Sequence, residues 1–291
     1  MTDSGCPFSK PDAPQGDPTE HEPRLTYNSY LKVPELLDLQ QCRSTPPAHD
    51  ELLFITIHQA YELWFKQILF ELDSVVEAMD ADEVYEASRL LQRVLKIEKL
   101  LVSQIHILET MTPRDFLRFR SVLNPASGFQ SIQFRELEFI TGIRDESLLR
   151  YIDQTSEDAR RLSDRLQAPS LRTHFYQLLQ RQGFPVEIPP EDGELTDALR
   201  QTNLDALFPL YRRPEEHFHL YTLSEALVEH DQNLLLWRFH HVRVVERLIG
   251  TKPGTGGSSG VAYLSSTLSR RAYPVLWDVR ATLSDDEIYG T

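Results

Sequence analysis

The segment that decides the fold is residues 50–81, which read DELLFITIHQAYELWFKQILFELDSVVEAMDA. Its apolar side chains recur at spacings of three and four residues, which is the period of one face of an α-helix. The apolar positions are Leu53, Phe54, Ile57, Tyr61, Trp64, Phe65, Ile68, Leu72, Val75 and Val76. The pattern predicts a helix of about 30 residues that buries one face.

More helices are predicted on the C-terminal side of this segment. Residues 83–110 repeat the apolar pattern, and residues 112–123 begin with Thr112, Pro113 and Asp115, in the order of an N-cap, a first-turn proline and an acid. The other expected helices cover 130–143, two segments within 145–182, 214–249 and a short segment at the C-terminal end, with a loop at 185–193. No strand-like alternation is found, so we expect an all-α fold, a single-domain bundle of long helices.

The composition restricts the partners. The 291 residues carry 30 Lys and Arg against 44 Asp and Glu, a net charge of −14. A chain this acidic lacks the basic surface that nucleic acids and anionic membranes attract. No apolar stretch is long enough for a transmembrane helix, and the N-terminus lacks the apolar core of a secretory signal. We therefore expect a cytoplasmic protein that contacts neither nucleic acid nor membrane.

The N-terminal segment differs from the rest of the chain. Residues 1–24 hold Pro7, Pro11, Pro14, Pro18 and Pro23 among polar and acidic residues. Such a composition buries too little apolar surface to become ordered. We expect a disordered tail over 1–24 and one all-α domain over 25–291.

Common catalytic motifs are missing from the sequence. It contains no HExxH zinc motif and no Gly-x-Ser-x-Gly elbow. One Glu-x-x-His pair occurs, at Glu216 and His219, whereas a di-iron bundle needs two. The glycines at 254–257 are not followed by the Lys-Ser/Thr of a phosphate-binding loop. The remaining candidates for functional residues are histidines on the predicted helices.

Two histidines lie on apolar helix faces. His58 shares a face with Phe54 and Tyr61, and His241 shares one with Trp237, whereas the neighbouring His240 points about 100° away. Two inward histidines on different long helices can flank a flat cofactor, and haem held by a neutral imidazole suits an all-α protein. The other interpretation is that each histidine is a core residue whose hydrogen bonds are satisfied.

Arg120 follows Phe116 by one helical turn, where a guanidinium beside an aromatic ring can hold a carboxylate by a bidentate pair. An ordinary interhelical salt bridge is the alternative. Thr255, in the glycine-rich run, offers a contact to a small polar ligand, although such runs are usually flexible loops. Tyr27 and Tyr30, at the start of the expected domain, are explained equally well by simple packing.

The chain resembles the tryptophan 2,3-dioxygenases, a family of haem enzymes. The most specific similarity is the run HQAYELWFK at 58–66 together with the loop GTGG at 254–257. The matching segments, which spread over most of the expected domain, are 25–31, 49–67, 108–113, 116–120, 125–131, 237–242 and 254–260.

The resemblance implies a role for each matching residue. His241 corresponds to the proximal ligand of the haem iron, and His58 to the distal histidine that accepts the indole N–H of the substrate. Arg120 corresponds to the arginine that pairs with the amino-acid carboxylate. Thr255 corresponds to the threonine that contacts the ammonium and carboxylate end.

The resemblance also implies the pocket walls and the assembly. The family is a homotetramer, a dimer of dimers, in which an N-terminal segment completes the pocket of a neighbouring subunit. That segment contains Tyr27, Tyr30 and Leu31 here. The remaining implied positions are Phe54 and Phe116 at the indole and Ser127 near the haem edge and the distal site.

The reaction implied is oxidative cleavage of the indole C2–C3 bond of L-tryptophan to N-formylkynurenine, the first step of the kynurenine pathway of tryptophan catabolism. It needs one haem b per subunit, ferrous in the active form, with O2 as co-substrate. Two alternatives remain. One is a relative that inserts a single oxygen atom into a tryptophan derivative and yields a 2-oxindole. The other is a non-catalytic haem or tryptophan sensor, which would not need His58, Arg120 and Thr255 together.

Overall fold

In the computed structural model, the described residues are 24–153, 155–193, 195–252, 254 and 260–284. The chain divides into two compact units, which meet in the sequence between Gln41 and Cys42. Within the first unit, α1 (Tyr27–Leu31) and α2 (Val33–Leu37) adjoin at Lys32, whose φ of 54° ends one helix and begins the next. The domain boundary expected after residue 24 stays a prediction, because residues 1–23 lie outside the described part of the chain.

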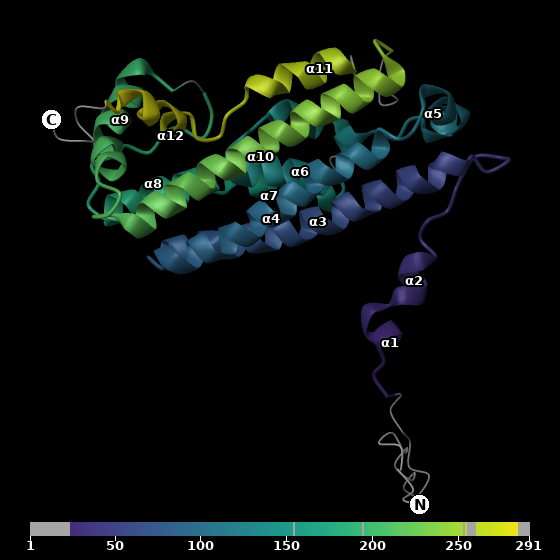
Figure 1. The fold of residues 1–291 in the computed structure, drawn as a ribbon, viewed down its shortest axis with the longest axis horizontal. Helices are drawn as coiled ribbons and strands as arrows, with labels where there is room; N and C mark the ends of the chain where they lie inside the picture. Colours follow the sequence, from purple (N-terminus) through teal and green to yellow (C-terminus); the bar gives the residue numbers. More distant parts are fainter. Residues whose placement is uncertain (1–23, 154, 194, 253, 255–259, 285–291) are drawn as a thin grey trace, which may run out of the picture. The chain divides into compact units, whose positions relative to one another are not determined.

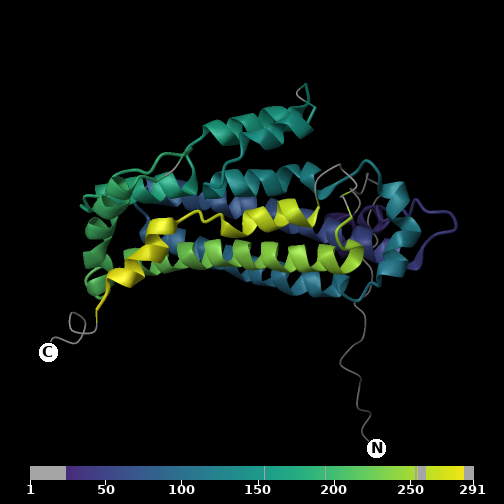
Figure 2. The same ribbon diagram turned by 90° about the horizontal axis from the view of Figure 1, so that it is seen from above.

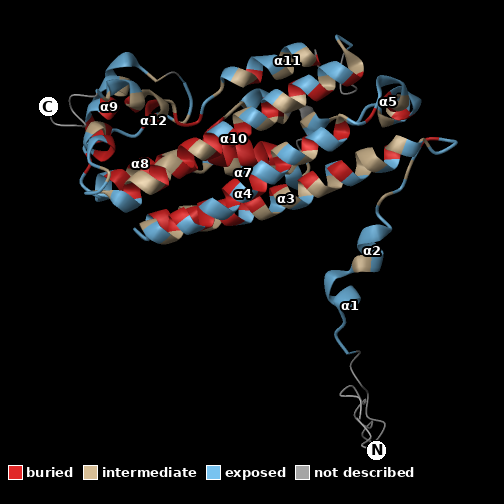
Figure 3. Cartoon of the chain, viewed as in Figure 1, coloured by how far each residue is buried: buried red, intermediate tan, exposed pale blue. Residues whose placement is uncertain are grey.

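Three long helices organise the second unit: α3 (His49–Asp80), α4 (Val84–Leu108) and α10 (Phe218–Ile249). Helix α4 packs against both α3 and α10 (Figure 1). The buried positions lie on the sides where these helices face one another (Figure 3). Ile68 and Leu91 are completely buried there, and burial of such a side chain stabilises the fold by about 1.5–3 kcal/mol. The predicted spacing over 50–81 thus produces the central packing surface.

Shorter elements surround these helices, and Figure 2 shows α11 running beside α10. The α-helices are α5 (Pro113–Phe119), α6 (Ile132–Thr141), α7 (Glu157–Gln167), α8 (Leu171–Arg181), α9 (Asp197–Arg212), α11 (Val261–Ser266) and α12 (Pro274–Asp278). The 3₁₀ turns are η1 (Arg120–Leu123), η2 (Gly128–Gln130), η3 (Glu146–Tyr151), η4 (Thr267–Ser269) and η5 (Val279–Thr282). No strand occurs among the described residues, so the all-α prediction is confirmed.

Several local predictions need correction. The helix expected over 112–123 begins as predicted, with the Thr112 hydroxyl accepting from the Asp115 amide, but it ends at Phe119. Phe119 has φ −122° and ψ −9°, outside the α region, and a 3₁₀ turn follows. The range 145–182 contains η3 in addition to the two expected helices. The apolar pattern does not single out α9, which contains Pro209, a residue that ordinarily breaks helices.

A buried ion pair joins α10 to α4 and α6. The His230 Nδ1 lies 2.6 Å from a Glu98 carboxylate oxygen, and its Nε2 lies 3.0 Å from the Thr141 hydroxyl. That hydroxyl donates its hydrogen to the carbonyl of Leu137, so it must accept from His230. Both ring nitrogens therefore carry hydrogen. Burial alone would lower the pKa of His230, but the charge and hydrogen bond of Glu98 raise it above its ordinary value.

Within the described ranges, no helix has the length and apolar content needed to cross a bilayer.

Candidate functional site

A cavity of about 290 Å³ opens inside the second unit, between α3, α5, α6, α10 and α11. Residues from separate parts of the sequence meet on its walls, and most of the surface they present to it is apolar. The predicted site residues that line it are Phe54, His58, Phe116, Arg120, Ser127 and His241. The fold therefore brings together six positions that the sequence analysis singled out.

Helix α10 contributes His241, whose ring stacks on that of Trp237 one turn earlier, with centroids 5.0 Å apart. The pKa of His241 falls to about 4, first because the ring is buried and then because His58 and Arg135 lie near it. The imidazole is therefore neutral at neutral pH. A neutral imidazole facing a cavity keeps one nitrogen lone pair free to ligate a metal ion.

Helix α3 contributes His58, whose Nδ1 lies 2.7 Å from the carbonyl oxygen of Phe54. A carbonyl only accepts, so Nδ1 carries the hydrogen, and in the neutral ring Nε2 is a bare acceptor. Burial lowers the pKa of His58, against the opposing effects of the Phe54 carbonyl and of Glu62. The His58 ring lies among other side chains of the protein, but its surface is exposed toward the cavity. It can therefore accept a hydrogen bond from a ligand N–H.

Three phenylalanines form an aromatic wall beside His58. The ring centroid of Phe54 lies 5.9 Å from that of Phe116 and 5.5 Å from that of Phe119, and the latter two are 5.3 Å apart. The Phe54 ring also lies 4.0 Å from the His58 ring. A wall of this kind suits a flat aromatic ligand, because offset and edge-to-face ring contacts are favourable.

Two polar residues enter the cavity from the chain after α5. Arg120 is half-buried and stands where α5 gives way to η1, so it follows the end of the helix. Ser127 caps η2, and its hydroxyl accepts from the Phe129 amide. A guanidinium at the edge of an apolar cavity is suited to a ligand carboxylate.

A buried charge cluster that the sequence analysis missed lies on another wall. Glu138 accepts from Arg135 at 2.5 Å and from Arg238 at 2.7 Å, and all three side chains are nearly inaccessible. The cluster carries one excess positive charge. Among the described residues, Arg135 Nε and Arg238 Nη1 have no hydrogen-bond partner. Buried donors of this kind normally have partners, so the cluster suits an anionic ligand group.

The spacing of Arg238 three residues before His241 was the available signal for this cluster. Two residues with that separation share a helix face, and this spacing is consistent with the position of Arg238 on the same cavity as the candidate ligand. The pairing with Glu138, on a different helix, has no sequence signature.

The structure does not test the four remaining predicted residues. Thr255 falls outside the described residues, although Gly254 and Gly260 on either side of its loop line the cavity. Tyr27, Tyr30 and Leu31 belong to the first unit, where their side chains are exposed.

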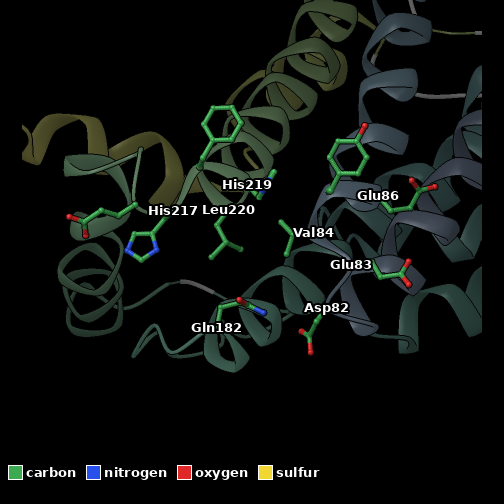
Figure 4. Close-up of a pocket in the computed structure, with 11 residues that line it drawn as sticks. Asp82, Glu83, Val84, Glu86, Gln182, His217, His219 and Leu220 are labelled. Atoms are coloured by element: carbon green, nitrogen blue, oxygen red, sulfur yellow. The ribbon is translucent and has the colours of Figure 1, made fainter.

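A second cavity of about 620 Å³ lies near the turn between α3 and α4. Figure 4 shows Asp82, Glu83 and Glu86 on one side of it and His217 on the other. Its described lining includes none of the predicted site residues and combines four carboxylates with two histidines. The first cavity is therefore the better candidate for the chemistry.

Known proteins of one family resemble this chain over most of its length. The family model described as tryptophan 2,3-dioxygenase matches residues 12–183 and 192–283. A tryptophan 2,3-dioxygenase of Nocardioides sp. is 48% identical over 269 residues, which cover 91% of this chain and 97% of that protein. Those of Herpetosiphon aurantiacus and Caulobacter vibrioides are 44% and 42% identical, and each alignment covers 89% of this chain and 98% of the relative. On these matches, the chain belongs to the tryptophan 2,3-dioxygenase family.

Proposed function

We propose that this protein catalyses the oxidative cleavage of the indole C2–C3 bond of L-tryptophan by O2, giving N-formylkynurenine. The observation that carries the proposal is the apolar cavity in which His58 and His241 both have lowered pKa values. One neutral histidine suits a metal and the other suits an N–H donor. Family membership supports the same activity.

The residues of the cavity fit haem b. His241 would hold the haem iron, since its imidazole is neutral and faces an apolar space. The unpartnered nitrogens of Arg135 and Arg238 would meet the acidic groups at the edge of the macrocycle. When bound, haem supplies the iron at which O2 reacts with the indole.

His58 would orient the substrate through its bare Nε2. The indole N–H is a donor, and the Phe54 carbonyl fixes the tautomer that can accept from it. The hydrogen bond sets the rotation of the indole ring in the cavity and holds its N–H proton at His58 Nε2. Orientation of this kind is a large part of what a binding site contributes to rate.

Two further residues would hold the amino-acid end of the substrate. Arg120 would pair with the carboxylate in a bidentate contact, and Thr255 would bind the ammonium and carboxylate end. Phe54 and Phe116, with Phe119 packed behind them, would cover the indole and exclude water. Ser127, on the same cavity wall, would contribute a hydroxyl near the haem edge and the distal site.

We further propose a homotetramer, a dimer of dimers, in which the first unit of one subunit completes the pocket of another. Tyr27, Tyr30 and Leu31 are large apolar or aromatic side chains, and they are 75%, 71% and 45% exposed. Burial of exposed groups of this kind against a partner lowers the free energy and so favours association. An isolated monomer would then have an incomplete site.

The product mass tests the reaction directly. Reduced, haem-loaded protein is mixed with L-tryptophan and labelled O2, and the organic product is weighed. Incorporation of both labelled atoms supports the proposal. Incorporation of one atom would instead assign the protein to 2-oxindole formation, and no conversion with stoichiometric haem present would favour a sensor.

A further inference from the structure

A second group of potential metal ligands lies away from the cavity, where the end of α4 meets α10. It consists of His106 and Glu109 from α4 and its C-cap, and His240 from α10. One ligand atom of each side chain lies within 4.8 Å of the corresponding atoms of the other two. None of these residues lines the candidate active site.

The backbone holds two of the three ligands in place. His106 lies in the last turn of α4, and the Glu109 amide donates to the carbonyl of His106. The His106 Nδ1 and Glu109 Oε2 atoms are 3.2 Å apart. Two ligands at about 2.0–2.1 Å from one tetrahedral ion are about 3.3–3.4 Å from each other. This pair therefore has the spacing of two ligands of a single ion.

The third ligand comes from the neighbouring helix. The His240 ring meets the His106 ring edge to face, with centroids 4.8 Å apart and planes at 80°. An ion pair between His106 and Glu109 explains their own contact, but it does not explain why a second imidazole approaches it. The ligand atoms lie within 4.8 Å of one another, so contraction by up to about 1.5 Å would bring all three donor atoms to one ion.

The charges around the group leave the carboxylate available. Besides His106, the carboxylate has a basic neighbour in Arg247, whose Nη1 lies 3.9 Å from Glu109 Oε2, a long contact for an ion pair. His106 is 48% exposed and Glu109 27% exposed as side chains, so an ion can reach them from solvent. Water can fill the remaining coordination position.

We propose that His106, Glu109 and His240 bind one divalent transition-metal ion of the zinc type per subunit. Two imidazoles and a carboxylate suit zinc, nickel or copper, whereas magnesium and calcium prefer oxygen ligands alone. The ion would fasten the end of α4 to α10, one residue from the candidate haem ligand. Binding of this ion would not require haem or substrate to be present.

Equilibrium dialysis of the untagged holoenzyme against Zn²⁺, with the metal measured by mass spectrometry, tests the stoichiometry. We expect one equivalent of zinc per subunit and at least a tenfold loss of affinity in both His106→Gln and His240→Gln. His49→Gln is the matched control, because His49 also contacts a carboxylate, that of Asp50 at 2.6 Å, but belongs to no such group of three among the residues that the structure describes. Magnesium should not compete.

X-ray absorption at the zinc edge gives an independent measurement, which the haem iron does not disturb. The zinc-loaded holoenzyme should show two imidazole nitrogens and an oxygen at about 2.0–2.1 Å. Coordination by oxygen alone, absence of bound zinc, or equal affinities in His106→Gln, His240→Gln and the control would each overturn the proposal. Retained haem content in every variant would show that the fold is intact.

Discussion

The Nδ1 of His58 lies 2.7 Å from the carbonyl oxygen of Phe54, one helical turn earlier in α3. The Phe54 carbonyl fixes the tautomer of His58. The ring nitrogen that carries a lone pair toward the ligand is therefore Nε2. Serine or threonine at position 58 would lack an acceptor fixed in this way.

Replacement of His58 by alanine should lower kcat/KM for L-tryptophan by about ten- to a hundredfold. It leaves the indole N–H without a partner in a buried site, which costs about 1–3 kcal/mol. Steady-state kinetics with L-tryptophan and with 1-methyltryptophan measure the effect. The methylated substrate has no N–H, so its turnover should depend much less on His58, and an equal loss for both substrates would contradict the assignment.

Replacement of Arg120 by leucine should reduce kcat/KM for L-tryptophan. The loss of transition-state stabilisation should be about 2–5 kcal/mol, because the substrate carboxylate loses its partner. Tryptamine, which lacks the carboxylate, provides the comparison. The native protein should strongly prefer L-tryptophan, and Arg120→Leu should lose most of that preference. Arg120→Lys keeps the charge but not the bidentate geometry, so an intermediate preference is expected.

Replacement of His241 by alanine should abolish stoichiometric haem binding, since the neutral imidazole that would ligate the iron is lost from the cavity. Haem per subunit is measured by absorbance after purification. His240→Ala serves as the control, because this neighbour points about 100° away on α10. Full haem content in His241→Ala would remove the ligand assignment.

The haem-free chain should lose stability as the pH falls from 6.5 toward 4. The His241 pKa is lowered from 6.5 to about 4 on folding, so between these values the unfolded state binds more protons. Stability then rises with pH across this window, by at most about 3 kcal/mol. Denaturant unfolding at several pH values measures the slope, and His241→Phe should flatten it. An unchanged slope in the variant would mean that other groups cause the dependence.

Replacement of Glu98 by glutamine should destabilise the fold by about 3–5 kcal/mol at neutral pH, because it leaves the buried His230 without its counter-charge. The urea midpoint reports the change. Glu86→Gln is the comparison, since Glu86 pairs with Arg89 on an exposed helix face and the substitution should barely move the midpoint. Similar shifts in both variants would argue against a charged His230.

The sequence predicts those parts of the fold and site that depend on helical period. His58 and His241 each lie on an apolar stripe, and the structure places both on the wall of one cavity. The long-range partners are different. The joining of Arg135, Glu138 and Arg238 depends on how α6 packs against α10, and spacing along the chain carries no information about that packing.

Local backbone angles explain the other differences. Arg120 was expected on the same helix face as Phe116, but Phe119 leaves the α region just before it. The residue still lines the cavity, as the first residue of the 3₁₀ turn. Helix α9 contains Pro209, which obscures its pattern although Thr196 supplies an ordinary N-cap.

Helix α10 runs from Phe218 to Ile249 without a glycine or proline. His230 and His241, which lie on it, are therefore separated by a rigid rod of about 16 Å. One inserted or deleted residue between them would rotate every later side chain by about 100° and remove His241 from the cavity. We therefore expect natural variants to differ by substitution between these two histidines and never by insertion or deletion. The length of α10 between them fixes the position of His241 relative to His230.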